Sequence, residues 1–233
     1  MSQFFWKEDL SELTAGNDEY AAFNRRIVNT KKQVLGVRMP DLRRLAKRVA
    51  KGMTAADAAA MYGALDESVY EEVLLFGLVL NAAKLTETEH IALTRRYLEK
   101  VDSWAGIDVF AEKNARFSGV TYWQFALEML HEKREFFVRY GIVACMANFL
   151  TDEKIAQVFA ELRMLKSNAY YVRMAAAWLY ATAAVRYYEI TMLELQNTAI
   201  DPWARRKAYQ KMLESRQMSE AQKGEIRLTR RLL

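Results

Sequence analysis

Four residue types are scarce in this chain, and each scarcity excludes a class of protein. Only 2 Pro and 9 Gly occur among 233 residues, so few positions can break a helix. The single cysteine, Cys145, cannot form an internal disulfide, and its apolar neighbours predict a buried thiol in a reducing compartment. The two histidines, His90 and His131, have no Cys or His at ligand spacing, which argues against a zinc site.

Several functional motifs are also missing. The chain has no G-x-S-x-G nucleophile turn and no glycine-rich phosphate loop of either common form. It has no uncharged apolar run of the roughly 18 residues that a membrane span needs, and Glu8 and Asp9 interrupt the place of a signal-peptide core. We therefore expect a cytoplasmic protein with no membrane segment, no metal and no cofactor. Any enzyme chemistry would rest on carboxylate, aromatic and Arg groups.

What the chain does have is an uneven distribution of charge. Its net charge is +5, but residues 24–51 hold ten Lys or Arg against Asp41 alone. Residues 52–130 are acidic, and residues 131–233 are basic again. Two basic blocks around an acidic middle indicate a polyanionic partner that touches both ends of the chain. The alternative is that these charges only solvate helix faces.

A short motif also repeats at a nearly constant interval. An aromatic or apolar pair followed two positions later by Arg begins apolar helical runs in the second half. The copies are Phe136-Phe137-Val138-Arg139, Tyr170-Tyr171-Val172-Arg173 and Pro202-Trp203-Ala204-Arg205, with a weaker one at Ser68-Val69-Tyr70-Glu71. A period near 34 residues with almost no internal Gly or Pro is typical of stacked helix pairs in an α-solenoid. Such an array behaves as a single domain, here residues 1–233.

Apolar spacing and capping residues predict an all-α chain. Thr54, Thr86 and Ser219 begin sequences of the capping-box type, and Thr151, Ser167 and Asp201 are further candidate N-caps. The expected helices are 4–14, 17–33, 38–51, 54–63, 67–83, 86–101, 104–116, 120–131, 133–149, 152–165, 168–185, 187–197, 202–215 and 219–231.

Two residues in the middle of the chain are candidates for chemistry. Asp108 follows Trp104 by four positions, so a helix would place the indole and the carboxylate on one face. Gly106 between them is expected to keep that surface open. The alternative is a carboxylate that interacts with a helix dipole beside a packing Trp.

The repeats contribute further candidates. Arg139 and Arg173 occupy equivalent positions, and a ladder of Arg side chains suits a row of phosphates. The alternative is that each Arg pairs with a neighbouring helix. Tyr170 and Tyr171 can stack on a sugar or base, although aromatic residues at the matching places of the preceding repeat favour packing. Trp178 on its own is more typical of a core.

In combination, these features resemble the DNA alkylation repair glycosylase family of the AlkD type, which is built from HEAT-like repeats. The similarity covers roughly residues 20–215. It lies in Leu35-Gly36-Val37-Arg38-Met39-Pro40-Asp41-Leu42-Arg43, in Trp104-x-x-x-Asp108, in the aromatic turn ending in Arg139, and in Tyr170-Tyr171-Val172-Arg173 leading to Trp178.

The resemblance implies a right-handed α-α superhelix with a concave basic face that holds double-stranded DNA. It also implies a monofunctional glycosylase without lyase chemistry. We expect a monomer, because a polar helix such as that at 219–231 can cap the end of the array. Such an enzyme excises positively charged N3-methyladenine and N7-methylguanine. Asp108 would be the catalytic carboxylate, because a carboxylate beside the sugar stabilises its developing positive charge. The lesion and DNA contacts would come from the Trp, Arg and Tyr residues at positions that match the family: Trp104, Arg139, Tyr170, Tyr171, Arg173 and Trp178.

The chain also departs from the family pattern. Ala181 stands where the pattern has an Arg, and the N-terminal Tyr that the pattern offers to DNA is replaced near Phe23 or Ile27. Two alternatives therefore remain beside the glycosylase. One is a non-catalytic HEAT-repeat binder of distorted or branched DNA, and the other is a protein-binding adaptor.

Overall fold

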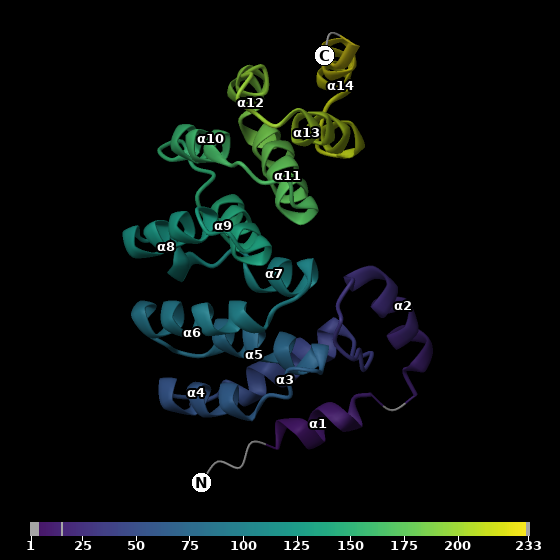
Figure 1. Cartoon of the computed structure of the whole chain (residues 1–233), viewed down its shortest axis with the longest axis vertical. Coiled ribbons are helices and arrows are strands. Elements are labelled where there is room, and N and C mark those ends of the chain that lie inside the picture. The colour runs from purple at the N-terminus through teal and green to yellow at the C-terminus, as the bar shows by residue number, and fades with distance from the viewer. Residues whose placement is uncertain (1–4, 15, 232–233) are drawn as a thin grey trace. The chain divides into compact units, whose positions relative to one another are not determined.

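The computed structural model describes residues 5–14 and 16–231. These residues form fourteen α-helices and one short 3-10 helix, and within them no strand occurs (Figure 1). The α-helices are α1 Trp6–Glu12, α2 Asp18–Val28, α3 Met39–Val49, α4 Ala55–Ala64, α5 Tyr70–Ala82, α6 Glu87–Lys100, α7 Trp104–Phe110, α8 Val120–Leu130, α9 Glu135–Asn148, α10 Ile155–Met164, α11 Tyr170–Arg186, α12 Tyr188–Glu194, α13 Pro202–Glu214 and α14 Glu220–Arg231, with η1 at Ala115–Phe117. The predicted all-α fold class is confirmed.

The helices group into two compact units. Unit 1 is Met1–Ala111 and carries α1 to α7, and unit 2 is Glu112–Leu233 and carries α8 to α14. Each unit is described by itself below. The expectation of one continuous repeat domain with a right-handed superhelical sense stays a prediction.

Unit 1 is built around α5. Every residue from Tyr70 to Leu80 is buried, and α3, α6 and α7 all pack against this helix. Helix α4 lies on α6, and α1 lies on α3. A mostly apolar helix that is buried on all sides is stable only when neighbours cover every face. The central position of α5 fixes where α7 lies within the unit.

The segment between α2 and α3 was predicted to be helical up to residue 33, and this prediction is wrong. Helix α2 ends at Val28 because Asn29 adopts a left-handed conformation with φ 51°. The chain then forms a loop whose N–H groups at Leu35 and Gly36 donate to the buried carboxylate of Glu71, each at 2.8 Å. Because the Glu71 carboxylate satisfies these N–H groups, the segment does not need the hydrogen bonds of a further helical turn.

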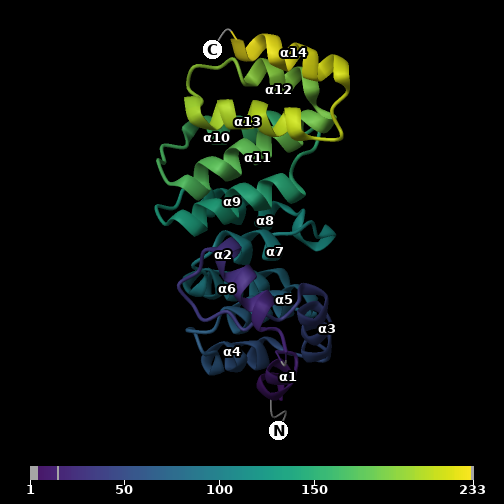
Figure 2. The ribbon, with the colours of Figure 1, turned by 90° about the vertical axis from the view of Figure 1, so that its right-hand side faces the viewer.

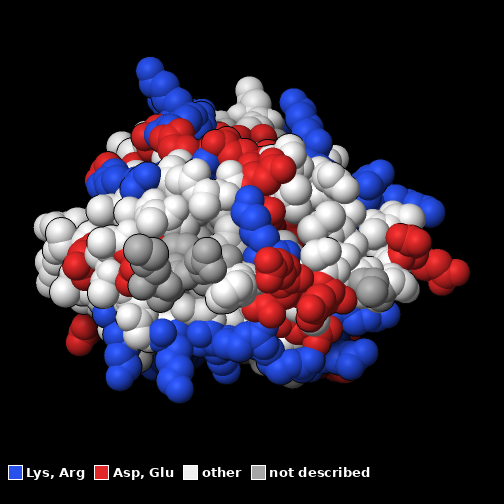
Figure 3. All heavy atoms as spheres, turned by 90° about the horizontal axis from the view of Figure 1, so that it is seen from below, with Lys and Arg blue, Asp and Glu red and all other residues white. Residues whose placement is uncertain are grey.

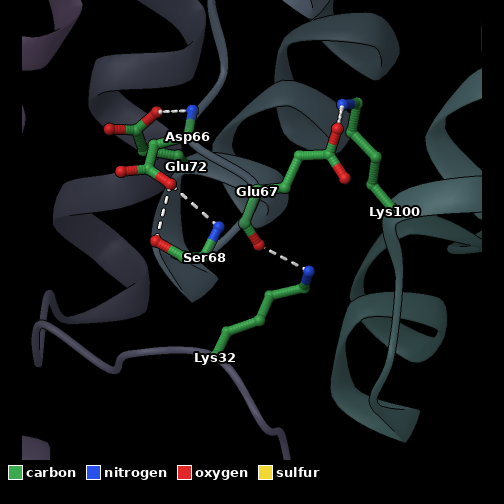
Figure 4. A network of polar contacts seen from close by, with 6 residues as sticks. All are labelled: Lys32, Asp66, Glu67, Ser68, Glu72 and Lys100. Atoms are coloured by element: carbon green, nitrogen blue, oxygen red, sulfur yellow. Dashed lines mark hydrogen bonds and ion pairs between the residues drawn. The ribbon is translucent and has the colours of Figure 1, made fainter.

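A second set of polar contacts fastens the same loop to the start of α5 (Figure 4). The Lys32 ammonium donates to the Glu67 carbonyl at 2.6 Å, and the Glu67 carboxylate pairs with Lys100 of α6. The Asp66 carboxylate accepts from the Ser68 N–H and hydroxyl, while the Asp66 N–H donates to Glu72. These contacts order the turn between α4 and α5.

Unit 2 consists of an inner row of helices with partners on one side. Helix α11 packs against both α9 and α13, so these three lie side by side, as both ribbon views show (Figures 1 and 2). Helices α8, α12 and α14 pack on α9, α11 and α13 respectively. The repeated motif of the sequence lies at the first residues of α9, α11 and α13, which confirms that it marks successive structural repeats.

Several predicted helix starts are confirmed and two are wrong. Thr54 and Thr86 form capping boxes, Ser219 accepts from the Gln222 N–H at 3.2 Å, and Asp201 accepts from the Ala204 N–H at 2.7 Å. Thr151 and Ser167 do not cap, because α10 begins only at Ile155 and α11 only at Tyr170. The helix expected over 104–116 ends at Phe110 and is followed by the 3-10 helix.

The remaining predictions from the sequence concern the surface charge, the burial of Cys145 and membrane spans. In the view of Figure 3, Lys and Arg side chains gather along the lower margin, below a patch of Asp and Glu. That a basic face is concave and binds DNA stays a prediction. Cys145 is completely buried, and burial raises the pKa of its thiol to about 12. Across the described residues, none of the helices is long and apolar enough to span a membrane.

Candidate functional site

Helix α7 of unit 1 carries the two residues predicted to do chemistry. The helix is short and has a defined beginning, because the Ser103 hydroxyl accepts from the Gly106 N–H at 3.4 Å. Trp104, Asp108 and Val109 are half-buried, whereas the other residues of α7 are buried. Trp104 and Asp108 are therefore both on the side of α7 that the core leaves uncovered, as their spacing predicted.

The indole of Trp104 has a fixed orientation. Its Nε1–H donates to the carbonyl oxygen of Ile27, in the last turn of α2, at 3.0 Å. This bond also satisfies a carbonyl at the end of α2 that has no partner within its own helix. The side chain therefore connects α7 to α2 and lies half-buried between them.

Asp102 is a residue that the sequence reasoning missed. Its carboxylate accepts from the Thr30 hydroxyl at 2.6 Å and from the Lys31 N–H at 2.9 Å. These bonds hold the loop after α2 next to the start of α7. The sequence offered one signal, an acidic residue directly before the capping Ser103, but nothing in it identified the distant partners.

Gly106 does not play the part that the sequence suggested. It is buried rather than at an open surface, and a Cβ there would lie 3.0 Å from Val101 Cγ1 and 3.4 Å from the Tyr97 hydroxyl. The Tyr97 hydroxyl donates to the Gly106 carbonyl at 3.0 Å. Gly106 thus lets α7 approach α6 closely, and the expectation that it keeps the reactive surface open is wrong.

In unit 2, Arg139 is directed into the protein. The residue is 4% exposed, and its Nη1 donates to the Tyr171 carbonyl at 2.8 Å. The guanidinium also lies 5.9 Å from the centre of the Tyr171 ring. Arg139 therefore fastens α9 to the first turn of α11, which is the alternative weighed for it, with a backbone carbonyl as its partner.

Arg173 makes the corresponding connection one repeat later. Its Nε donates to Asp201 at 3.1 Å, and its guanidinium lies 4.6 Å from the centre of the Trp203 ring. Because Asp201 also caps α13, the contact links α11 to the start of α13. The two Arg side chains thus form a series of connections between repeats.

Tyr170 and Tyr171 belong to the same region. Their rings are in edge contact at 5.2 Å, Tyr171 also lies 5.8 Å from Phe136, and Tyr170 lies 5.8 Å from Trp203. Tyr171 is half-buried, whereas Tyr170 is 55% exposed. Of the two, Tyr170 offers the larger surface to a ligand.

Trp178 lies near the middle of α11, seven residues after Tyr171. It is half-buried and forms part of the wall of a hollow of about 290 Å³, to which Ala181 also contributes. Trp178 is therefore not a core residue. The small side chain of Ala181 leaves this space open, where an Arg would occupy part of it.

The structure thus brings the predicted residues together in two groups. Trp104 and Asp108 share one face of α7 in unit 1, and Arg139, Tyr170, Tyr171 and Arg173 form a connected set in unit 2. Trp178 is on the same helix as the last three. Among the residues with assigned positions, no cluster of three His, Cys, Asp or Glu side chains could hold a metal ion.

The chain matches a known family over most of its length. Residues 9–212, which include α2 to α12 and nearly all of α13, match the DNA alkylation repair enzyme family. A comparison with curated proteins gave no match. Because the family match includes both groups of candidate residues and far more than half of the sequence, the chain belongs to the DNA alkylation repair enzyme family.

Proposed function

We propose that this protein is a DNA glycosylase that excises N3-methyladenine and N7-methylguanine from duplex DNA. Both lesions carry a positive charge on the base, which makes the base a good leaving group without a strong general acid. This fits a chain whose candidate residues are one carboxylate, two Trp, two Arg and two Tyr. The enzyme would then have to stabilise the positive charge that develops on the sugar and direct a water molecule to it.

The observation that carries this proposal is the uncovered face of α7. A half-buried carboxylate at Asp108 is next to a half-buried indole at Trp104, on a helix whose start is capped and whose backbone is bonded to Tyr97. Groups held in advance of the reaction lose little energy to reorganisation. In this proposal Asp108 stabilises the oxocarbenium-like sugar, and Trp104 excludes bulk water from it.

The unit 2 residues would hold the DNA. Trp178 packs against the backbone next to the lesion, and Tyr170 and Tyr171 contact a sugar or base. Arg173 binds a phosphate with the N–H groups that remain after its contact to Asp201, since a guanidinium has five such donors. The buried Arg139 acts indirectly, because its bond to the Tyr171 carbonyl holds the start of α11 in place.

The test is release of free N7-methylguanine and N3-methyladenine from methylated duplex DNA, measured by chromatography under single-turnover conditions. Asp108→Asn removes the charge at nearly constant shape, and we expect the rate to fall by at least about 100-fold. Asp18→Asn is the matched control, because it removes an exposed carboxylate from α2 of the same unit. We expect it to release base at the wild-type rate.

The possible outcomes separate the candidate functions. If Asp108→Asn stays within a few-fold of wild type, the catalytic role of Asp108 is wrong. If neither protein releases base but both bind DNA in a salt-sensitive way, the chain is a non-catalytic DNA binder. A protein-binding adaptor would show no salt-dependent affinity for DNA at all.

A further inference from the structure

A groove in unit 2 runs beside the C-terminal half of α11, starting at Trp178. It consists of two hollows, of about 290 and about 430 Å³, that share Thr182, Val185 and Gln217 as lining residues. Trp178 lines the first hollow, and Tyr187 lines the second. The two hollows therefore adjoin, with one aromatic side chain in each.

The charged side chains of the groove are mainly cationic. Lys211 lines the first hollow together with Glu214, and Lys113 and Arg186 line the second. Within the described part of the chain, neither Lys113 nor Lys211 forms an ion pair. Two ammonium groups without a carboxylate partner favour an anionic ligand.

The other charges of the groove are already engaged. Arg186 pairs with Asp152 at 3.2 Å and lies 5.0 Å from the centre of the Tyr187 ring. Glu214 accepts from the Gln210 amide at 2.8 Å. The excess positive charge therefore lies on Lys211 in the first hollow and on Lys113 in the second.

The lining also supplies groups that suit bases. Trp178 and Tyr187 offer aromatic surfaces, and Gln217 adds a side-chain amide. Any unpaired base can stack on an aromatic ring, whereas bases in a duplex are already stacked on each other. The combination of cations for phosphates and rings for bases is the one that single-strand-binding grooves use.

We infer that this groove binds a short stretch of single, unpaired DNA strand. Its phosphates lie near Lys113 and Lys211, and its bases stack on Trp178 and Tyr187. The inference goes beyond excision, because the binding needs neither an alkylated base nor Asp108. Since the groove starts at Trp178, an unpaired strand in it continues from the residue proposed to pack against the DNA backbone next to the lesion.

The test is fluorescence anisotropy with a labelled, unmodified oligothymidylate, titrated with the full chain at low and high salt. The double variant Lys113→Glu/Lys211→Glu reverses both unpaired groove cations, and we expect its affinity to fall about tenfold or more. Lys133→Glu/Lys166→Glu is the matched control. It makes the same change in net charge at two exposed lysines of unit 2 that do not line the groove. We expect it to weaken binding by no more than about threefold.

A second variant tests the groove without any change in charge. Thr182→Phe places a ring at one of the three residues that both hollows share, and we expect about a tenfold loss of affinity for the oligothymidylate. Equal weakening by the two charge variants, or wild-type binding by a folded Thr182→Phe protein, would overturn the inference.

Base release from methylated duplex is measured on the same samples. Groove-dependent strand binding without base release would contradict the proposed glycosylase alone, and base release without groove-dependent binding would contradict only this inference.

Discussion

At the scale of single residues, Gly36 lets the loop after α2 approach α2 closely. Its φ of +87° lies in the left-handed region, and a Cβ there would lie 2.8 Å from the Ala21 Cβ of α2. The neighbouring N–H groups face the Glu71 carboxylate. Backbone conformation, close approach and hydrogen bonding therefore all favour glycine at this position.

Replacement of Gly36 by Ala tests this account. We expect Gly36→Ala to lower the free energy of unfolding by about 2–4 kcal/mol, because it combines left-handed strain with a clash against α2. Gly52→Ala is the control. Gly52 also has a positive φ of +75°, but no atom lies within 4 Å of its Cβ position, so we expect a loss of only about 1 kcal/mol. Urea denaturation measures both, and equal losses would show that the contact with α2 contributes nothing.

The buried carboxyl of Glu71 leads to a prediction about how the free energy of unfolding depends on pH. Burial raises the pKa of its carboxyl, although the N–H groups of Leu35 and Gly36 oppose that shift. An acid whose folded pKa is raised holds its proton longer in the folded state, so its contribution to stability decreases as the pH rises from about 4.5 through the folded pKa. We therefore expect the free energy of unfolding of the wild type, minus that of Glu71→Gln, to decrease over that window. Denaturation at a series of pH values measures this quantity. An increase with pH would show that the pKa of Glu71 is not raised.

At the scale of elements, the Arg residues of the repeat motif determine how neighbouring helices are joined. Arg139 bonds to the start of α11, and Arg173 bonds to the start of α13. Each joint combines a hydrogen bond with an aromatic ring of the next repeat. The motif therefore recurs because the Arg of one repeat fastens its helix to the start of the corresponding helix in the next repeat.

The joint at Arg173 has a close control within the chain. Arg173 pairs with Asp201 and lies over Trp203 in a half-buried place, whereas Arg186 pairs with Asp152 and lies over Tyr187 with 66% of its side chain exposed. We expect Arg173→Ala to cost about 1–2 kcal/mol and Arg186→Ala under about 0.5 kcal/mol, since water screens an exposed pair. Thermal unfolding of both variants is the measurement. A larger loss for Arg186→Ala would refute the idea that burial makes the joint strong.

The sequence predicted elements better than it predicted their contacts. Apolar spacing and capping boxes located most helices, because these signals act within a few residues of each other. The end of α2 at Val28 was missed, since the loop after it depends on Glu71 and Asp102, which are distant in the sequence. The helical spacing correctly placed Trp104 and Asp108 on one face, because that signal is local. The bond from Trp104 to Ile27 could not be foreseen, because the two residues are distant in the sequence.

At the scale of the whole molecule, the proposed chemistry depends on residues from both compact units. Trp104 and Asp108 belong to unit 1, and Arg139 and Trp178 belong to unit 2. The family match extends over parts of both units. If residues of both units act on one transition state, substitutions in the two units should affect the same step of the reaction.

A double-mutant cycle tests this cooperation without reference to the arrangement of the units. We expect Asp108→Asn to slow single-turnover base release by at least about 100-fold and Trp178→Ala by about tenfold. The double variant should be only about threefold slower than Asp108→Asn, because residues that stabilise one transition state have non-additive effects. Lys166→Ala, an exposed change in unit 2, should leave the rate of either background unaltered. Full additivity of the Asp108 and Trp178 effects would mean that the two units contribute independently, with Trp178 acting on DNA binding away from the reacting sugar.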